Sequence, residues 1–222
     1  MSRPIFIVLM SFVALHSIGQ QYTFKATSPA VRATMQKAVE NSHKFIEHTV
    51  SPDLFEKHFQ LITSLSTVKS EYASFHYTPY MDDTISFIPS KYELRYLITI
   101  EDDTLTDSFV IPVDSVGNPD IDTSNSHYIL EDLKAYHKLF SGQLKFDYKD
   151  VKEFLKAKGL KGYSIHLQNS VERIGRTEYK RMKPYKFYWF VYRYYPNFEI
   201  EYVIDPETGK YFKNKRKLRH AA

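Results

Sequence analysis

The amino-acid sequence predicts an α+β protein of two halves, each an antiparallel sheet with helices on one face. Alternating apolar and polar runs, typical of strands, follow amphipathic segments in both halves. In each half a pair of such runs ends at a corner that begins with Asp and contains Gly, at 114–119 and 205–209. With 222 residues, 43% of them hydrophobic, the chain can bury a core.

The start of the chain indicates a secretory signal peptide at 1–19. Arg3 precedes an uncharged apolar run that is too short to span a bilayer. Ser17 and Gly19 place small residues three and one positions before a cut ahead of Gln20. No later run is apolar enough to cross a membrane. We therefore expect a periplasmic or secreted protein without a transmembrane segment.

The chain contains no cysteine. This excludes disulfides, thiolate metal sites, a cysteine nucleophile and a lipid anchor on an N-terminal cysteine. An exported chain of this size without disulfides is typical of a bacterium.

Charge is divided unequally along the sequence. Residues 21–142 have 10 Lys and Arg against 17 Asp and Glu, whereas residues 143–222 have 19 against 9. Three interpretations stay open: two faces that attract each other, a basic surface for an acidic partner, or solvated faces that keep the protein soluble.

Two amphipathic helices are predicted after the signal peptide. Ser28 as N-cap, with Pro29 at the first helical position, begins a helix that extends to about His48. The sequence Ser-Pro-Asp at 51–53 begins a second, whose apolar stripe extends to Leu65.

Extended structure follows. Alternation predicts a strand within 68–80 and then a hairpin with strands at 92–100 and 105–113, joined by a turn at 102–103. A third helix is predicted at 128–140. The Ser-Gly pair that ends it marks a boundary between an N-terminal domain, 20–141, and a C-terminal domain, 142–213.

In the C-terminal domain, Asp147 caps a short helix that Gly159 ends. Strands are expected at 163–168 and 171–182, followed by an aromatic strand within 185–195. Trp189 falls on one face of that strand and Tyr188 on the other.

The last predicted elements form a hairpin. In the run 198–204, Glu199 and Glu201 fall on the face expected to meet water. The corner at 205–209 returns the chain into a short last strand, which completes a three-stranded core. Residues 214–222 are expected to be a frayed basic tail.

Part of this domain resembles a PepSY-type domain. The helix ends in Lys-Ala-Lys-Gly-Leu-Lys-Gly at 156–162, and 202–210 contains the hairpin pattern Asp-x-x-Thr-Gly-Lys. The resemblance covers residues 144–213 and implies one helix against an antiparallel sheet. It also implies an extracytoplasmic module, without catalytic residues, that binds or restrains a peptidase or another partner. The matched positions are structural and comprise Gly159, Gly162, Asp205, Thr208 and Gly209.

The sequence shows no Gly-x-Ser-x-Gly, no Gly-rich phosphate loop and no His-Glu-x-x-His. Partly buried histidines explain His43, His48 and His58 better than a zinc site, because a spacing of five does not align the first two on one helix face.

A calcium loop is the sharper metal candidate. Oxygen ligands stand at positions one, three, five and twelve of such a loop, in Asp120, Asp122, Ser124 and Glu131. However, Asn125 stands where a calcium loop has Gly, and His127 where it has an aliphatic residue. The alternative is a polar loop that caps the following helix.

Basic residues between Arg173 and Lys186 stand beside many tyrosines, a combination that also suits nucleic acid. For an exported protein, an acidic polymer, an anionic lipid surface or an acidic protein face fits better.

We therefore expect an exported, non-enzymatic envelope protein, without a cofactor, that binds a protein or peptide. The expected contact residues are Tyr188, Tyr192, Tyr194, Arg193, Arg181 and Lys183. One alternative is a small-ligand-binding protein or enzyme, with a pocket between the sheet and the N-terminal helices that uses His76, Tyr77 or Tyr80. Another is a structural domain without separable activity.

Overall fold

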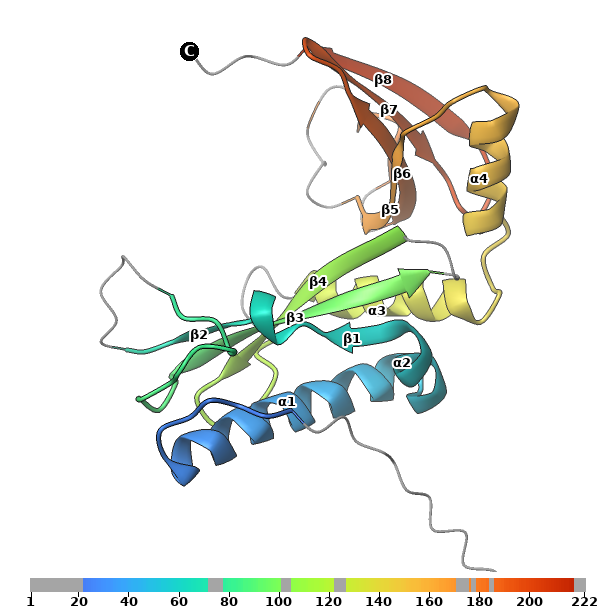
Figure 1. The fold of residues 1–222 in the computed structure, drawn as a ribbon. Helices are drawn as coiled ribbons and strands as arrows, with labels where there is room; N and C mark the ends of the chain where they lie inside the picture. The colour runs from blue at the N-terminus through green and yellow to red at the C-terminus, as the bar shows by residue number, and fades with distance from the viewer. Residues whose placement is uncertain are drawn as a thin grey trace, which may run out of the picture.

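The computed structural model describes residues 22–71, 78–100, 105–121, 127–170, 176, 179–183 and 186–217. These residues form four α-helices and two four-stranded antiparallel sheets, as Figure 1 shows. The α+β class predicted from the sequence is confirmed. The predicted signal peptide lies outside the described residues, and no helix among those described is long and apolar enough to cross a membrane.

The N-terminal sheet is built around β3 (Lys91–Ile100). On one side β3 pairs with β1 (Phe59–Leu61) and β2 (Thr67–Lys69), and on the other with β4 (Leu105–Asp114). The predicted hairpin is confirmed. Every second residue of β3 is buried, because the helices cover one face of the sheet; the buried residues are Tyr92, Leu94, Tyr96, Ile98 and Ile100.

Helix α1 (Pro29–Val50) packs beneath this sheet in Figure 1. The Ser28 hydroxyl accepts a hydrogen bond from the Val31 amide at 3.2 Å, so the predicted N-cap is confirmed. Met35 and Ile46 are fully buried on the inner stripe of α1.

The second helix is shorter than predicted. Helix α2 (Pro52–His58) ends before Phe59, and the next residues form β1 instead. Residues Thr63–Leu65 then form the 3₁₀ turn η1, in which Leu65 is exposed. The apolar pattern of residues 59–65 is compatible with a helix or with a strand. Residues 59–61 form a strand because they pair with β3. The predicted strand at 68–80 is likewise limited to β2 and an isolated bridge at Tyr80 in the described residues; 72–77 lie outside them.

Helix α3 (His127–Phe140) lies behind β4 in the view of Figure 1 and contacts both sheets, through β4 and β5 (Ser164–Asn169). It also packs against α1. The Tyr136 hydroxyl donates to the Leu167 carbonyl oxygen at 3.2 Å, and His137 Nδ1 lies 2.9 Å from the Val50 carbonyl oxygen. One continuous cluster of buried apolar side chains therefore runs from the N-terminal sheet through α3 to the C-terminal sheet.

The C-terminal sheet has the order β5-β6-β7-β8, with β6 at Phe187–Tyr194, β7 at Phe198–Ile204 and β8 at Tyr211–Lys217. Helix α4 (Tyr148–Ala157) covers one face, as Figure 1 shows. Its predicted N-cap is confirmed, because the side chain of Asp147 and that of Asp150 form a capping box. Trp189 is fully buried beneath α4, and its indole nitrogen donates to the Phe146 carbonyl oxygen at 2.9 Å.

Two predictions about this half were wrong. Residues 214–217 are not part of a frayed tail, because β8 pairs with β7 along its full length, from Tyr211 opposite Ile204 to Lys217 opposite Phe198. The predicted three-stranded core is present as β6, β7 and β8, and β5, predicted at 163–168, adds the fourth strand. In the predicted strand 171–182, the described residues 179–182 form a turn, and 171–175, 177 and 178 lie outside the described part.

Candidate functional site

The two edges of the C-terminal sheet differ. The β5 edge is covered by α3, where Tyr136 donates a hydrogen bond to the outward-pointing carbonyl of Leu167. Strand β8 is the other edge, and no described strand pairs with its outer side. An uncovered edge presents backbone N–H and C=O groups that another extended chain can pair with.

The hydrogen-bond ladder shows which residues of β8 face outward. Adjacent pairs of an antiparallel ladder alternate between bonded and non-bonded. The Asp205 amide donates to the Lys210 carbonyl oxygen at 2.9 Å, so these two residues are a hydrogen-bonded pair. Every second pair from there along β7 and β8 is hydrogen-bonded as well. Bonded pairs therefore include Phe212, Asn214 and Arg216 on β8. The outward N–H and C=O groups belong to the alternate residues, which are Tyr211, Lys213, Lys215 and Lys217.

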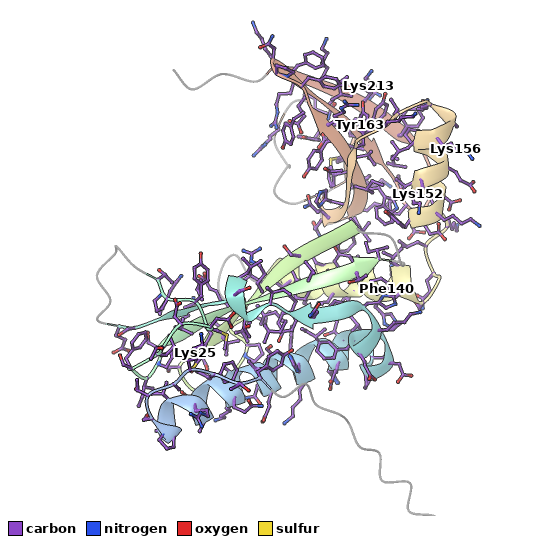
Figure 2. The ribbon with its side chains drawn as sticks, viewed as in Figure 1. Lys25, Phe140, Lys152, Lys156, Tyr163 and Lys213 are labelled. Carbon is purple, nitrogen blue, oxygen red and sulfur yellow. The ribbon has the colours of Figure 1, made fainter. Side chains whose placement is uncertain are left out.

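Three of these outward residues form what we call the lysine row: Lys213, Lys215 and Lys217. All three are exposed. Their side chains lie on the same face of the sheet as α4, which covers this face nearer the middle of the sheet. Lys213 Nζ lies 5.5 Å from the ring centre of Tyr202, and Lys215 Nζ lies 4.4 Å from that of Phe198. Among the described residues, no carboxylate pairs with the lysine row. Figure 2 shows Lys213 on this sheet.

On the opposite face of β8, Arg216 and Asn214 bond to two carboxylates of β7. Arg216 Nε lies 3.1 Å from Glu199 Oε2, a second guanidinium nitrogen is closer still, and the Asn214 amide donates to Glu201 at 3.2 Å. The hydrogen bond with Glu199 raises the pKa of Arg216. Thus β8 has a face with unpaired cations and a face whose cation is already paired.

The two carboxylates on this face are a correction to the sequence analysis. Glu199 and Glu201 were expected to meet water, yet they are only 6% and 3% exposed. A small cluster beside them includes Tyr179, Tyr188 and Phe190. A hollow of about 400 Å³ opens next to these residues; it is lined by Tyr179, Glu199, Glu201, Asn214, Arg216 and the lysine row.

The predicted contact residues do not form one surface. Tyr188 is buried, and its hydroxyl accepts from the Lys183 amide at 2.9 Å. Tyr192 is half-buried and stacks on His166, with ring centres 5.1 Å apart. Tyr194 is 59% exposed.

The predicted basic contacts are also separated. Arg193 lies on the α4 face, opposite to the tyrosines, and donates to the Lys161 carbonyl oxygen at 2.6 Å. Arg181 and Lys183 are exposed in the turn at 179–183. The sequence analysis missed the lysine row because it treated these residues as a tail, although their alternation after the corner at 205–209 was the available signal.

The described residues contain no group of three or more histidines and carboxylates that could hold a metal ion. Of the calcium candidates, Asp120 lies 3.8 Å from Lys91, Glu131 lies 2.6 Å from Lys134, and Asp122 and Ser124 are outside the described part.

The three histidines weighed for zinc have other surroundings. The His43 ring lies among those of Tyr22, Phe55 and Tyr96. The His58 ring stacks on Phe140 with centres 3.7 Å apart, and His48 is exposed.

The region expected to form a pocket in the alternative hypothesis is filled where it is described. Met35 and Ile46 on α1, and Tyr96 and Ile98 on β3, are all fully buried. Tyr80 is 46% exposed, and His76 and Tyr77 lie outside the described residues.

Comparison with known proteins adds no family to this description. No protein-family model matches the chain, and no match was found among curated proteins or solved structures. The resemblance to PepSY-type domains stays a prediction.

Proposed function

We propose that this protein is an exported, non-enzymatic module that binds an extended segment of another protein by adding it to β8. The observation behind this proposal is the uncovered edge of β8, where Tyr211 and the lysine row direct their backbone groups outward. Strand addition of this kind is a recurring mode of peptide recognition, in which main-chain hydrogen bonds supply affinity.

The edge is held in place before any peptide arrives. β8 is paired with β7 over seven residues, and β7 contributes buried Tyr202 and Ile204 to the main cluster on one face and buried Val203 to the small cluster on the other. A template fixed in this way loses little conformational freedom when a peptide binds. The PepSY resemblance suggests a narrower form of the proposal, in which the bound segment belongs to a peptidase that the module restrains.

The hollow beside β8 favours a second candidate, the binding of a small molecule. Its volume of about 400 Å³ falls within the range of small-molecule sites. Such sites are mostly apolar, however, whereas this lining is dominated by charged and amide side chains. We therefore prefer strand addition.

Amide hydrogen exchange of the purified protein tests the proposal residue by residue. The probes are soluble peptides of about ten residues with high strand propensity, in neutral, acidic and basic versions. A peptide that adds to β8 will slow exchange at Lys213, Lys215 and Lys217. Phe212, Asn214 and Arg216, which already bond to β7, will change little. If no peptide of any charge slows exchange in the lysine row, the proposal is wrong.

Two variants of one residue separate the backbone from the charge. Lys215→Pro removes an outward N–H that β7 does not use, so the edge of the sheet tolerates it. Lys215→Gln removes the same charge and keeps the N–H. We expect the proline variant to lose peptide binding by at least about tenfold relative to the glutamine variant. Equal affinities would show that the backbone of β8 is not the binding element.

A further inference from the structure

We infer that the segment bound by β8 has acidic side chains at every second position, opposite the lysine row. This inference rests on the strand addition proposed above and specifies its ligand: an extended stretch in which Asp or Glu alternates with neutral residues. The structure supports it through the coincidence of two properties in the same three residues, outward backbone groups and unpaired cationic side chains.

Sheet geometry connects these two properties. Residues directly opposite each other on neighbouring strands place their side chains on the same face, with Cβ atoms about 4.5–5.5 Å apart. The residues of an added strand that lie opposite Lys213, Lys215 and Lys217 therefore place their side chains beside the three ammonium groups. Since side chains repeat with a period of two in either strand direction, this holds for parallel and antiparallel addition.

The intervening positions of the added strand meet different neighbours. They lie beside Phe212, Asn214 and Arg216, on the face where Glu199 already pairs with Arg216. An acidic residue there approaches the buried carboxylates of Glu199 and Glu201, and the Arg216 guanidinium beside it is already paired with Glu199. Neutral side chains are therefore favoured at these positions, and a continuous acidic run is not.

A second copy of β8 fits the edge poorly. Antiparallel pairing of two β8 edges through their outward groups places lysine rows on the same face, directly opposite each other. Like charges in that arrangement are destabilising. The lysine row thus opposes self-association, as charged edge residues commonly do, and at the same time provides cations for an acidic strand.

Three peptides of equal length, with the same number of Thr and Val residues, test the inference. The first alternates Glu with Thr or Val, the second has the same composition with all Glu residues at one end, and the third replaces every Glu with Gln. Binding is measured by calorimetry near physiological ionic strength, and amide exchange at β8 is followed in parallel. We expect the alternating peptide to bind at least about tenfold more tightly than either of the others.

Matched variants assign the preference to the lysine row. Replacing Lys213, Lys215 and Lys217 together by Gln is expected to abolish the preference for the alternating peptide. The control replaces the exposed Lys25, Lys44 and Lys57 of the N-terminal half by Gln, which removes the same charge and leaves the preference unchanged. Figure 2 shows Lys25 in the N-terminal half and Lys213 on the C-terminal sheet.

The possible failures are distinguishable. Equal binding of all three peptides, with slowed exchange in the lysine row, would refute the acidic spacing and leave strand addition intact. No binding and no slowed exchange would refute both. Inorganic polyphosphate serves as a further probe. If it and the peptide with all Glu residues at one end bind as tightly as the alternating peptide, without slowed exchange at β8, then β8 attracts polyanions in general and both proposals are wrong.

Discussion

At the scale of single residues, His43 links stability to pH. Its ring is enclosed by aromatic rings, and its Nε2 is buried without a hydrogen-bond partner among the described residues. Burial lowers the pKa of His43 to about 4, from an ordinary value of 6.5. At mildly acidic pH the His43 imidazole therefore stays neutral in the native state, whereas it is protonated in the unfolded state.

The consequence is a loss of stability as pH falls. Above pH 6.5 the histidine is neutral in both states; between pH 6.5 and about 4 only the unfolded state binds the proton. We expect the free energy of unfolding to fall by up to about 3 kcal/mol across this window through His43 alone. Denaturant unfolding of the wild type and of His43→Phe at several pH values measures it. Parallel pH profiles for the two proteins would contradict the prediction.

The sequence could not reveal every residue's environment. Trp189 and Tyr188 were correctly assigned to opposite faces, because strand periodicity alone decides that. The burial of Glu199 was missed, because it depends on Arg216, 17 residues away, and on Tyr179, 20 residues away along the chain. Charge and alternation cannot show which neighbours cover a strand face.

At the scale of elements, the β7–β8 hairpin depends on its corner. Gly209 has φ +67°, and a Cβ there would lie 3.0 Å from the Phe146 ring. Gly142 has φ +68°, and a Cβ at that position would have no neighbour within 4 Å among the described residues. Both Gly→Ala variants incur the cost of a left-handed backbone, of order 1 kcal/mol, and only Gly209→Ala adds the clash.

We therefore expect Gly209→Ala to lower the melting temperature more than Gly142→Ala does. It should also weaken peptide binding at β8, since the clash shifts the start of that strand. Circular dichroism and the peptide titration measure the two effects. Equal melting temperatures for the two variants would show that Phe146 moves aside without cost.

Elements with local signals were predicted well, and those decided by distant partners were not. Ser28 and Asp147 supplied N-caps, and the hairpin of β3 and β4 followed from alternation. The end of α2 was wrong because pairing of Phe59 with Ile98 on β3 overrides helical periodicity. The alternation of residues 211–217 could have indicated β8, but side-chain alternation does not reveal which of its backbone groups face outward.

At the scale of the whole molecule, α3 joins the two halves through a shared core. Leu133 is fully buried on α3, and the same cluster contains Met35 on α1 and Trp189 on β6. We therefore expect both halves to unfold in one cooperative transition, although the sequence suggested a boundary after residue 141.

The single tryptophan makes this testable. Met35→Ala removes a fully buried side chain from the N-terminal half, at a cost of about 2–5 kcal/mol. Trp189 fluorescence reports on the C-terminal half. If the two halves unfold as one cooperative unit, Met35→Ala shifts the fluorescence transition to a lower denaturant concentration than in the wild type. The transition followed by circular dichroism shifts by the same amount. An unshifted fluorescence transition would mean that the halves unfold independently.

Because α3 covers the β5 edge, β8 is the edge of the C-terminal sheet that the described residues leave open to another strand. A peptide added there becomes the new edge, and its acidic side chains then repel a second peptide of the same kind. If the proposal is correct, we therefore expect growth to stop after one strand. The complex would then contain one peptide per molecule, whereas an uncharged edge would allow the repeated addition that leads to a fibril.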